Sequence, residues 1–160
     1  IGTGRDDGKE AGEFCPILYK KERVELLYHG QFWYSETPDK PSKSWNSFCN
    51  RICTWGKFKD KKTDKDFFFF SSHFDHVSNE ARVNSAKLLV QKVQEIAGDL
   101  PYFCTGDLNC DPDEEPISFI LNTGLFKDSY SISETTRKVL QALCIIGILI
   151  STQNIESTIF

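Results

Sequence analysis

The chain has 160 residues, of which 39% are hydrophobic and 26% are charged, and its formal net charge is −4 at pH 7. These values predict one globular domain with an apolar core, and they argue against binding to polyanions through overall charge alone. The longest apolar run, at residues 139–150, is too short to span a bilayer. The six cysteines contain no CxxC pair, which argues against a zinc ribbon or a thioredoxin motif.

The N-terminal part of the chain predicts two strands and a long loop. Extended patterns at residues 13–19 and 24–34 flank the polar sequence KKER, which predicts a hairpin. Residues 35–47 are rich in Pro, Ser and Lys and predict a long connection. This loop could contact a substrate through Trp45, but a solvated loop with one packed Trp is the preferred interpretation.

The middle of the chain predicts a strand, a second strand and a helix. Residues 52–58 alternate well enough for a strand, and residues 66–74 (DFFFFSSHF) form a continuous apolar run, which is typical of a strand covered on both faces. A helix follows, capped by Ser78 or Asn79 and ended by Gly98. We expect its apolar face to consist of Val83, Ala86, Val90, Val93 and Ala97.

The next segments predict an α/β fold and a C-terminal region of less certain structure. The sequence LPYFCTGD predicts a strand with Cys104 buried in it, so residues 67–105 form a strand–helix–strand unit. The sequence DPDEEPISFILNTG predicts a helix with Pro116 near its start and Gly124 at its end. Residues 134–160 are consistent with a helix followed by a strand, or with a segment that has no defined role in the fold.

Polar side chains follow two of the predicted strands. The first group, in SSHFDH, contains His73, Asp75 and His76, and the second, in GDLNCDP, contains Asp107 and Asn109. A polar strand end before a helix cap explains the first group about as well as a functional site does. An Asx-turn explains the second, and spacing alone favours that turn.

The expected position of the two groups favours a functional site. One helical crossover joins the two strands, so they should be parallel, and ligands collect at the carboxyl ends of parallel strands. A His, an Asp and an Asn at that edge suit phosphoester hydrolysis, in which Mg²⁺ offsets the developing charge. A third polar group, GRDDGKEAGEF, contains Arg5 and Glu13 and lies either in a solvated loop or beside a site.

The pair of motifs resembles the endonuclease/exonuclease/phosphatase (DNase I-like) superfamily. SSHFDH, a helix and then GDLNCDP carry the resemblance, and FWYSETPDKPSKSWN followed by RICTW is similar to a bacterial branch of the superfamily. The resemblance covers roughly residues 4–130. It implies an α/β fold of four layers with two packed sheets, present here as an incomplete domain over residues 1–133 with a divergent tail over residues 134–160.

The resemblance also implies a hydrolase of phosphoester bonds that depends on Mg²⁺ or Mn²⁺. By motif, His73 would contact the scissile phosphate, Asp107 would orient or activate the attacking water, and Asn109 would hold phosphate or metal together with Asp107. Supporting roles at most are expected for Asp75, His76, Arg5 and Glu13. Substrates of the superfamily include nucleic acids, phospholipids and small phosphodiesters, and the sequence does not select among them.

Two motifs of the superfamily have no counterpart in this sequence. They are the N-terminal Glu that binds the metal and the C-terminal Ser-Asp-His, and no His follows His76. We therefore expect a fragment that by itself binds Mg²⁺ weakly and shows little or no hydrolysis. The alternatives are a non-catalytic module that binds a phosphorylated ligand and a non-functional remnant. No protein partner is evident, and the cysteine pattern leaves the cellular compartment open.

Overall fold

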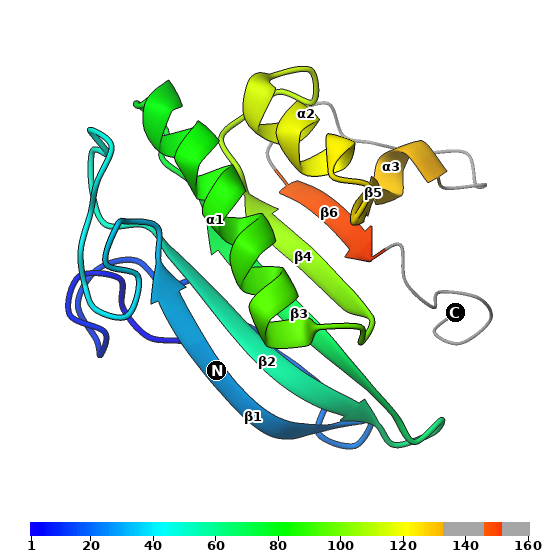
Figure 1. The fold of residues 1–160 in the computed structure, drawn as a ribbon. Helices are drawn as coiled ribbons and strands as arrows, with labels where there is room; N and C mark the ends of the chain where they lie inside the picture. Colours follow the sequence, from blue (N-terminus) through cyan, green and yellow to red (C-terminus); the bar gives the residue numbers. More distant parts are fainter. Residues whose placement is uncertain (133–145, 152–160) are drawn as a thin grey trace.

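A computed structural model describes residues 1–132 and 146–151, which form one mixed β-sheet with helices on one face (Figure 1). The strand order is β1-β2-β3-β4-β6-β5. The strands are β1 (Val24–Trp33), β2 (Ile52–Asp60), β3 (Lys65–His73), β4 (Tyr102–Asp107), β5 (Phe126–Asp128) and β6 (Ile146–Ser151). The helices are α1 (Asn79–Ala97), α2 (Glu115–Asn122) and α3 (Ser129–Ile132). The predicted α/β class is confirmed.

The strand–helix–strand unit is present as predicted. Strands β3 and β4 are parallel neighbours joined through α1, whereas β1 and β2 add to the sheet in antiparallel fashion. In the parallel register, the last residues of the two strands, His73 and Asp107, are direct partners. The crossover therefore places the ends of both strands at the same edge of the sheet.

Helix α1 begins and ends at the predicted caps. The Ser78 hydroxyl accepts a hydrogen bond from the Ala81 N–H at 3.1 Å, and Gly98 ends the helix with φ 55°. The face that packs on the sheet consists of Ala81, Ser85, Ala86, Leu89, Val90, Val93 and Ala97. Val83 is only half-buried, which corrects one predicted member. It lies two residues from Ala81, and two residues correspond to about 200° around a helix.

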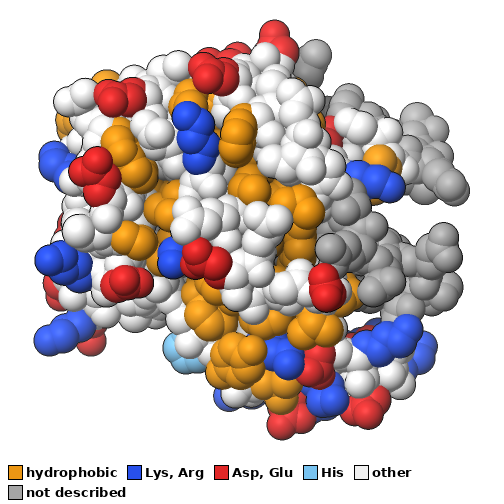
Figure 2. Space-filling view, in the orientation of Figure 1, with side chains coloured by type: hydrophobic (Ala, Val, Ile, Leu, Met, Phe, Trp, Pro, Cys, Tyr) orange, Lys and Arg blue, Asp and Glu red, His pale blue; other side chains and the backbone are white. Residues whose placement is uncertain are grey.

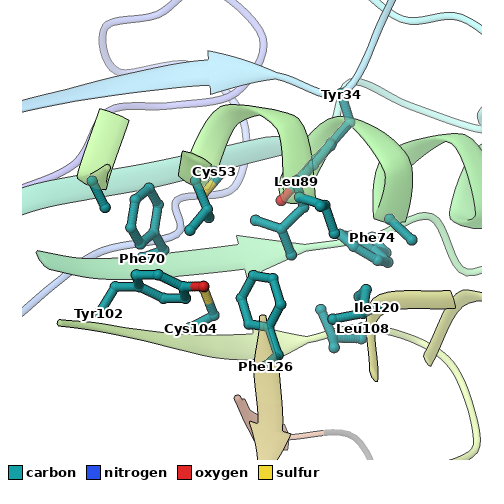
Figure 3. Close-up of a cluster of buried hydrophobic side chains, with 14 of the residues drawn as sticks. Tyr34, Cys53, Phe70, Phe74, Leu89, Tyr102, Cys104, Leu108, Ile120 and Phe126 are labelled. Carbon is teal, nitrogen blue, oxygen red and sulfur yellow. The ribbon is translucent and has the colours of Figure 1, made fainter. Parts of the chain in front are cut away.

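The core fills the space between the sheet and the helices (Figure 3). The side chains of Phe68 and Phe70 are 1% and 0% exposed, and Cys104 is buried beside them as predicted. Phe67 and Phe69 alternate to the opposite face and are half-buried. The expectation that both faces of β3 are covered therefore holds fully on the helical face and partly on the other.

The predicted N-terminal hairpin is wrong. Residues 15–20 form no strand, and β1 pairs with β2 instead. Pro16 has no N–H to donate to a ladder, and the backbone around it is held by two reciprocal bonds of 2.9 Å between Ile1 and Ile17. Cys15 packs in a small apolar cluster with Trp33 and Ile52. The segment thus lies across the sheet rather than extending it.

The connection between β1 and β2 is the long loop predicted from composition. Its Trp45 is partly buried and packs against the core, so the preferred interpretation of a packed Trp is confirmed. Over the helical face, acidic and basic side chains are interspersed, with no single-sign patch (Figure 2). This mixture of charges agrees with the small net charge of the chain, −4.

The described part of the C-terminal region belongs to the sheet. Strand β6 runs antiparallel to both β4 and β5, which matches the strand interpretation of this segment. Residues 133–145 and 152–160 lie outside the described residues, as does most of the predicted tail. Within the described ranges there is one sheet with one helical layer, in keeping with an incomplete four-layer sandwich. None of the helices in these ranges has the length and apolarity of a membrane span.

Candidate active site

The predicted site residues gather at the edge of the sheet where β3 and β4 end. In Figure 1 the N-terminal loop and the loop after β1 lie at this same end of the sheet. Parallel strands bring their carboxyl ends together, and loops that return to that edge supply further side chains. The site is therefore built from two strand ends and two loops.

The imidazole of His73 lies between two carboxylates. Its Nε2 is 3.7 Å from Oδ2 of Asp107, and its Nδ1 is 3.5 Å from Oε2 of Glu13. Burial lowers the pKa of His73, the Arg51 guanidinium lowers it further, and the two carboxylates partly oppose this. The ring is therefore mostly neutral at pH 7, so it can accept a proton or donate a hydrogen bond toward a substrate.

Asp107 and Asn109 form both a turn and a potential binding site. The Asn109 N–H donates to Asp107 Oδ1 at 3.0 Å, which is the Asx-turn that spacing favoured. The Asn109 side chain donates through Nδ2 to the Phe74 carbonyl at 3.0 Å, so its Oδ1 stays available as an acceptor or a cation ligand. The Asp107 side chain is 36% exposed. The turn is compatible with a binding site, because it fixes the orientation of the Asp107 and Asn109 side chains.

Arg5 and Glu13 lie beside this pair, in a loop whose residues are largely exposed. The Arg5 guanidinium contacts Oε2 of Glu13 at 2.5 Å, and the Arg5 N–H bonds the Glu13 carbonyl at 3.1 Å. Trp33 Nε1 donates to the Arg5 carbonyl at 2.6 Å. This loop is thereby tied to the end of β1, with the Glu13 carboxylate pointing at His73.

Asp75 is a buried structural group. Its side chain is 1% exposed and accepts hydrogen bonds from the N–H groups of Ser78, Val77 and Phe48 and from the Ser47 hydroxyl, at 2.8–3.1 Å. Burial alone would raise the pKa of Asp75, but these hydrogen bonds outweigh it and hold the pKa at about 2. Asp75 therefore joins the loop after β1 to the start of α1.

Arg51 is a residue of this site that sequence reasoning missed. Its side chain is 4% exposed, and its guanidinium lies 2.6 Å from His76 Nδ1, 3.5 Å from Asp75 and 4.0 Å from Glu13. Arg51 therefore connects Asp75 and His76 to Glu13, the carboxylate that faces His73. The available signal was a charged residue directly before the buried strand in RICTW.

Comparisons with known proteins show which family this chain belongs to. No family model matches the chain. A solved endonuclease/exonuclease/phosphatase from Bacteroides vulgatus is 38% identical with a TM-score of 0.87, over 96% of this chain and 64% of that one. A mannosyl-6-phosphatase from Bacteroides thetaiotaomicron is 36% identical with a TM-score of 0.84, over 95% of this chain and 62% of that one. The chain belongs to the endonuclease/exonuclease/phosphatase superfamily.

A more distant superfamily relative is Protein angel of Drosophila melanogaster. It is 26% identical over 125 residues, which are 75% of this chain and 34% of angel. The chain thus spans about one third of this curated relative and less than two thirds of the solved structures named above. The predicted DNase I-like fold is confirmed by the solved structures.

The donor set at the edge of the sheet suits a hard cation. Asp107 offers a partly exposed carboxylate, and the fixed orientation of Asn109 leaves its amide oxygen free. Mg²⁺ is commonly held by one or two carboxylates and retained waters, so the two side chains fit part of such a site. Among the residues that the structure describes, no group of three His, Cys, Asp or Glu side chains is arranged to enclose a metal by itself.

Proposed function

We propose that this chain carries part of the catalytic site of a metal-dependent phosphoester hydrolase. The observation that carries the proposal is the His73–Asp107 pair, with Nε2 and Oδ2 at 3.7 Å on register partners of two parallel strands. Membership of a superfamily that contains a mannosyl-6-phosphatase at 36% identity supports it, and makes a sugar phosphate the first substrate to test.

Each side chain has a distinct part in the proposed reaction. Asp107 orients the attacking water and accepts its proton, while His73 donates a hydrogen bond to a phosphate oxygen as negative charge develops there. Glu13 Oε2 lies 3.5 Å from Nδ1 of His73, and its charge would stabilise the ring when it is protonated. Asp107 and Asn109 would hold Mg²⁺ or Mn²⁺, which supplies charge neutralisation of the phosphoryl group.

The test is hydrolysis of mannose 6-phosphate and of bis-p-nitrophenyl phosphate with Mg²⁺ and with a chelator. We expect at most slow cleavage from this chain, and we expect that cleavage to need the metal and to be lost in Asp107→Asn, since a general base contributes about 10²- to 10⁴-fold. Asp111→Asn, on an exposed side chain of the same turn region, is the matched control. Cleavage without metal, or equal rates in the two variants, would refute the proposal. Phosphate binding without turnover would indicate a non-catalytic module.

A further inference from the structure

Exposed apolar side chains stand beside the charged site. Phe48 and Val77 are 65% and 61% exposed, and the Phe48 ring lies edge-to-face on the His76 ring with centroids 5.1 Å apart at 74°. We infer that Phe48, His76 and Val77 form a subsite that binds the sugar ring of a phosphorylated substrate. The inference rests on the proposed function, because it concerns the part of the same substrate that carries the phosphate.

The backbone under Phe48 is fixed. The Phe48 N–H and the neighbouring Ser47 hydroxyl both donate to the buried Asp75 carboxylate at 3.1 Å. The Ser78 hydroxyl donates to the Trp45 carbonyl at 2.9 Å, which ties the same loop to the cap of α1. The loop therefore presents the aromatic ring on a rigid support, and binding need not first order the loop.

The subsite is joined to the catalytic pair through one guanidinium. Arg51 Nη2 lies 2.6 Å from His76 Nδ1, while Arg51 Nη1 lies 4.0 Å from the Glu13 carboxylate that faces His73. The buried Arg51 therefore fixes the position of His76, which contacts the Phe48 ring, relative to His73. The inference places the phosphate of the substrate at His73 and its ring at Phe48.

The chemistry of the subsite suits a sugar. A guanidinium only donates hydrogen bonds, so Nδ1 of His76 accepts from Arg51 and the ring N–H lies at Nε2. The exposed His76 thus offers a donor at the edge of an apolar surface made by Phe48 and Val77. A sugar ring has a C–H face that packs on an aromatic ring and hydroxyls that accept from such a donor. A nucleobase is the competing ring.

The test measures binding, separately from catalysis, by titrating the full chain with mannose 6-phosphate, inorganic phosphate and AMP in one Mg²⁺ buffer. We expect mannose 6-phosphate to bind more tightly than phosphate. Phe48→Ala should lower the ratio of these two affinities about fivefold to tenfold, as loss of an aromatic contact implies. Phe48→Tyr, which keeps the ring, should preserve the ratio. Leu18→Ala removes an 88% exposed apolar side chain elsewhere and is the matched control.

The possible outcomes separate this inference from the proposed function. If phosphate binds but mannose 6-phosphate binds no better, or if Phe48→Ala leaves the ratio unchanged, the subsite is refuted and the phosphate site stands. If AMP binds better than mannose 6-phosphate and depends equally on Phe48, the assignment to a sugar is refuted. If none of the three ligands binds, the subsite and the proposed function both fail. Circular dichroism of each variant confirms that it is folded.

Discussion

At the scale of single residues, the two acids at the carboxyl ends of β3 and β4 differ in what surrounds them. Asp75 is 1% exposed and its carboxylate is occupied by four hydrogen bonds and by Arg51. Asp107 is 36% exposed and uses one oxygen for the turn, with the other facing His73. A buried carboxylate that is fully bonded stabilises the fold, whereas a partly exposed one is available to a ligand.

Asp75 should make the stability of the protein sensitive to acid. Its pKa is about 2, below the ordinary value of 3.8, so its contribution is fully present above 3.8 and is lost as the pH falls through 2. The shift corresponds to about 2 kcal/mol of unfolding free energy. Asp75→Asn cannot ionise, so the stability difference between wild type and variant should narrow by about that amount on acidification. Urea unfolding at neutral and acidic pH measures it.

The control for this prediction is Asp39→Asn, which changes an exposed acid in the loop after β1, the loop that Asp75 joins to α1. It should leave the free energy of unfolding nearly unchanged, because substitutions of exposed side chains usually have small effects on stability. A constant difference between wild type and Asp75→Asn from neutral to acidic pH would show that Asp75 does not carry this acid sensitivity.

At the scale of elements, the site depends on how closely β3 and β4 approach. Gly106 pairs with Ser72 and has φ 146°, and a Cβ built on it would lie 1.8 Å from the Ser72 carbonyl oxygen. Only a residue without a side chain fits there. The next pair in the register is His73 and Asp107, so this contact sets the spacing of the pair that we propose to be catalytic.

Gly106→Ala should therefore disrupt both the sheet and the site. The added methyl group would collide with backbone atoms that cannot rotate away, and the φ of 146° disfavours any side chain. We expect a loss of about 3 kcal/mol or more in unfolding free energy, or failure to fold. In Gly98→Ala the added Cβ would have no atom within 4 Å and only φ would be strained, so we expect a loss of about 1 kcal/mol in unfolding free energy. Equal losses in urea unfolding would contradict the close approach.

The sequence could predict elements whose signals are local. Helix α1 has its caps and periodicity within its own residues, and the crossover it makes predicts that His73 and Asp107 meet. The packing of residues 13–19 was not predictable, because an extended pattern does not specify whether a segment pairs in the sheet or lies across it. Arg51 was missed for a similar reason, since its role depends on three loops that meet only in the folded chain.

At the scale of the whole molecule, the two faces of the sheet differ in packing. The helical face carries the closed core, while the opposite face holds an apolar groove of about 380 Å³. Its lining includes Phe67, Phe69 and Phe103 from the sheet, together with residues of the N-terminal segment around Ile17. The run of four phenylalanines therefore faces two different environments, which alternation along a strand explains and the run itself does not reveal.

Two neighbouring phenylalanines on β3 test this asymmetry. Phe70 is 0% exposed and packs beneath α1, so Phe70→Ala should remove about 3–5 kcal/mol of unfolding free energy through lost burial and an unfilled cavity. Phe69 is half-buried in the groove, where removal only widens an existing space, and Phe69→Ala should remove about 1 kcal/mol. Urea unfolding of both variants measures the difference. Similar losses would mean that the groove face is packed as tightly as the core, because both rings would then leave cavities that the protein cannot relax to fill.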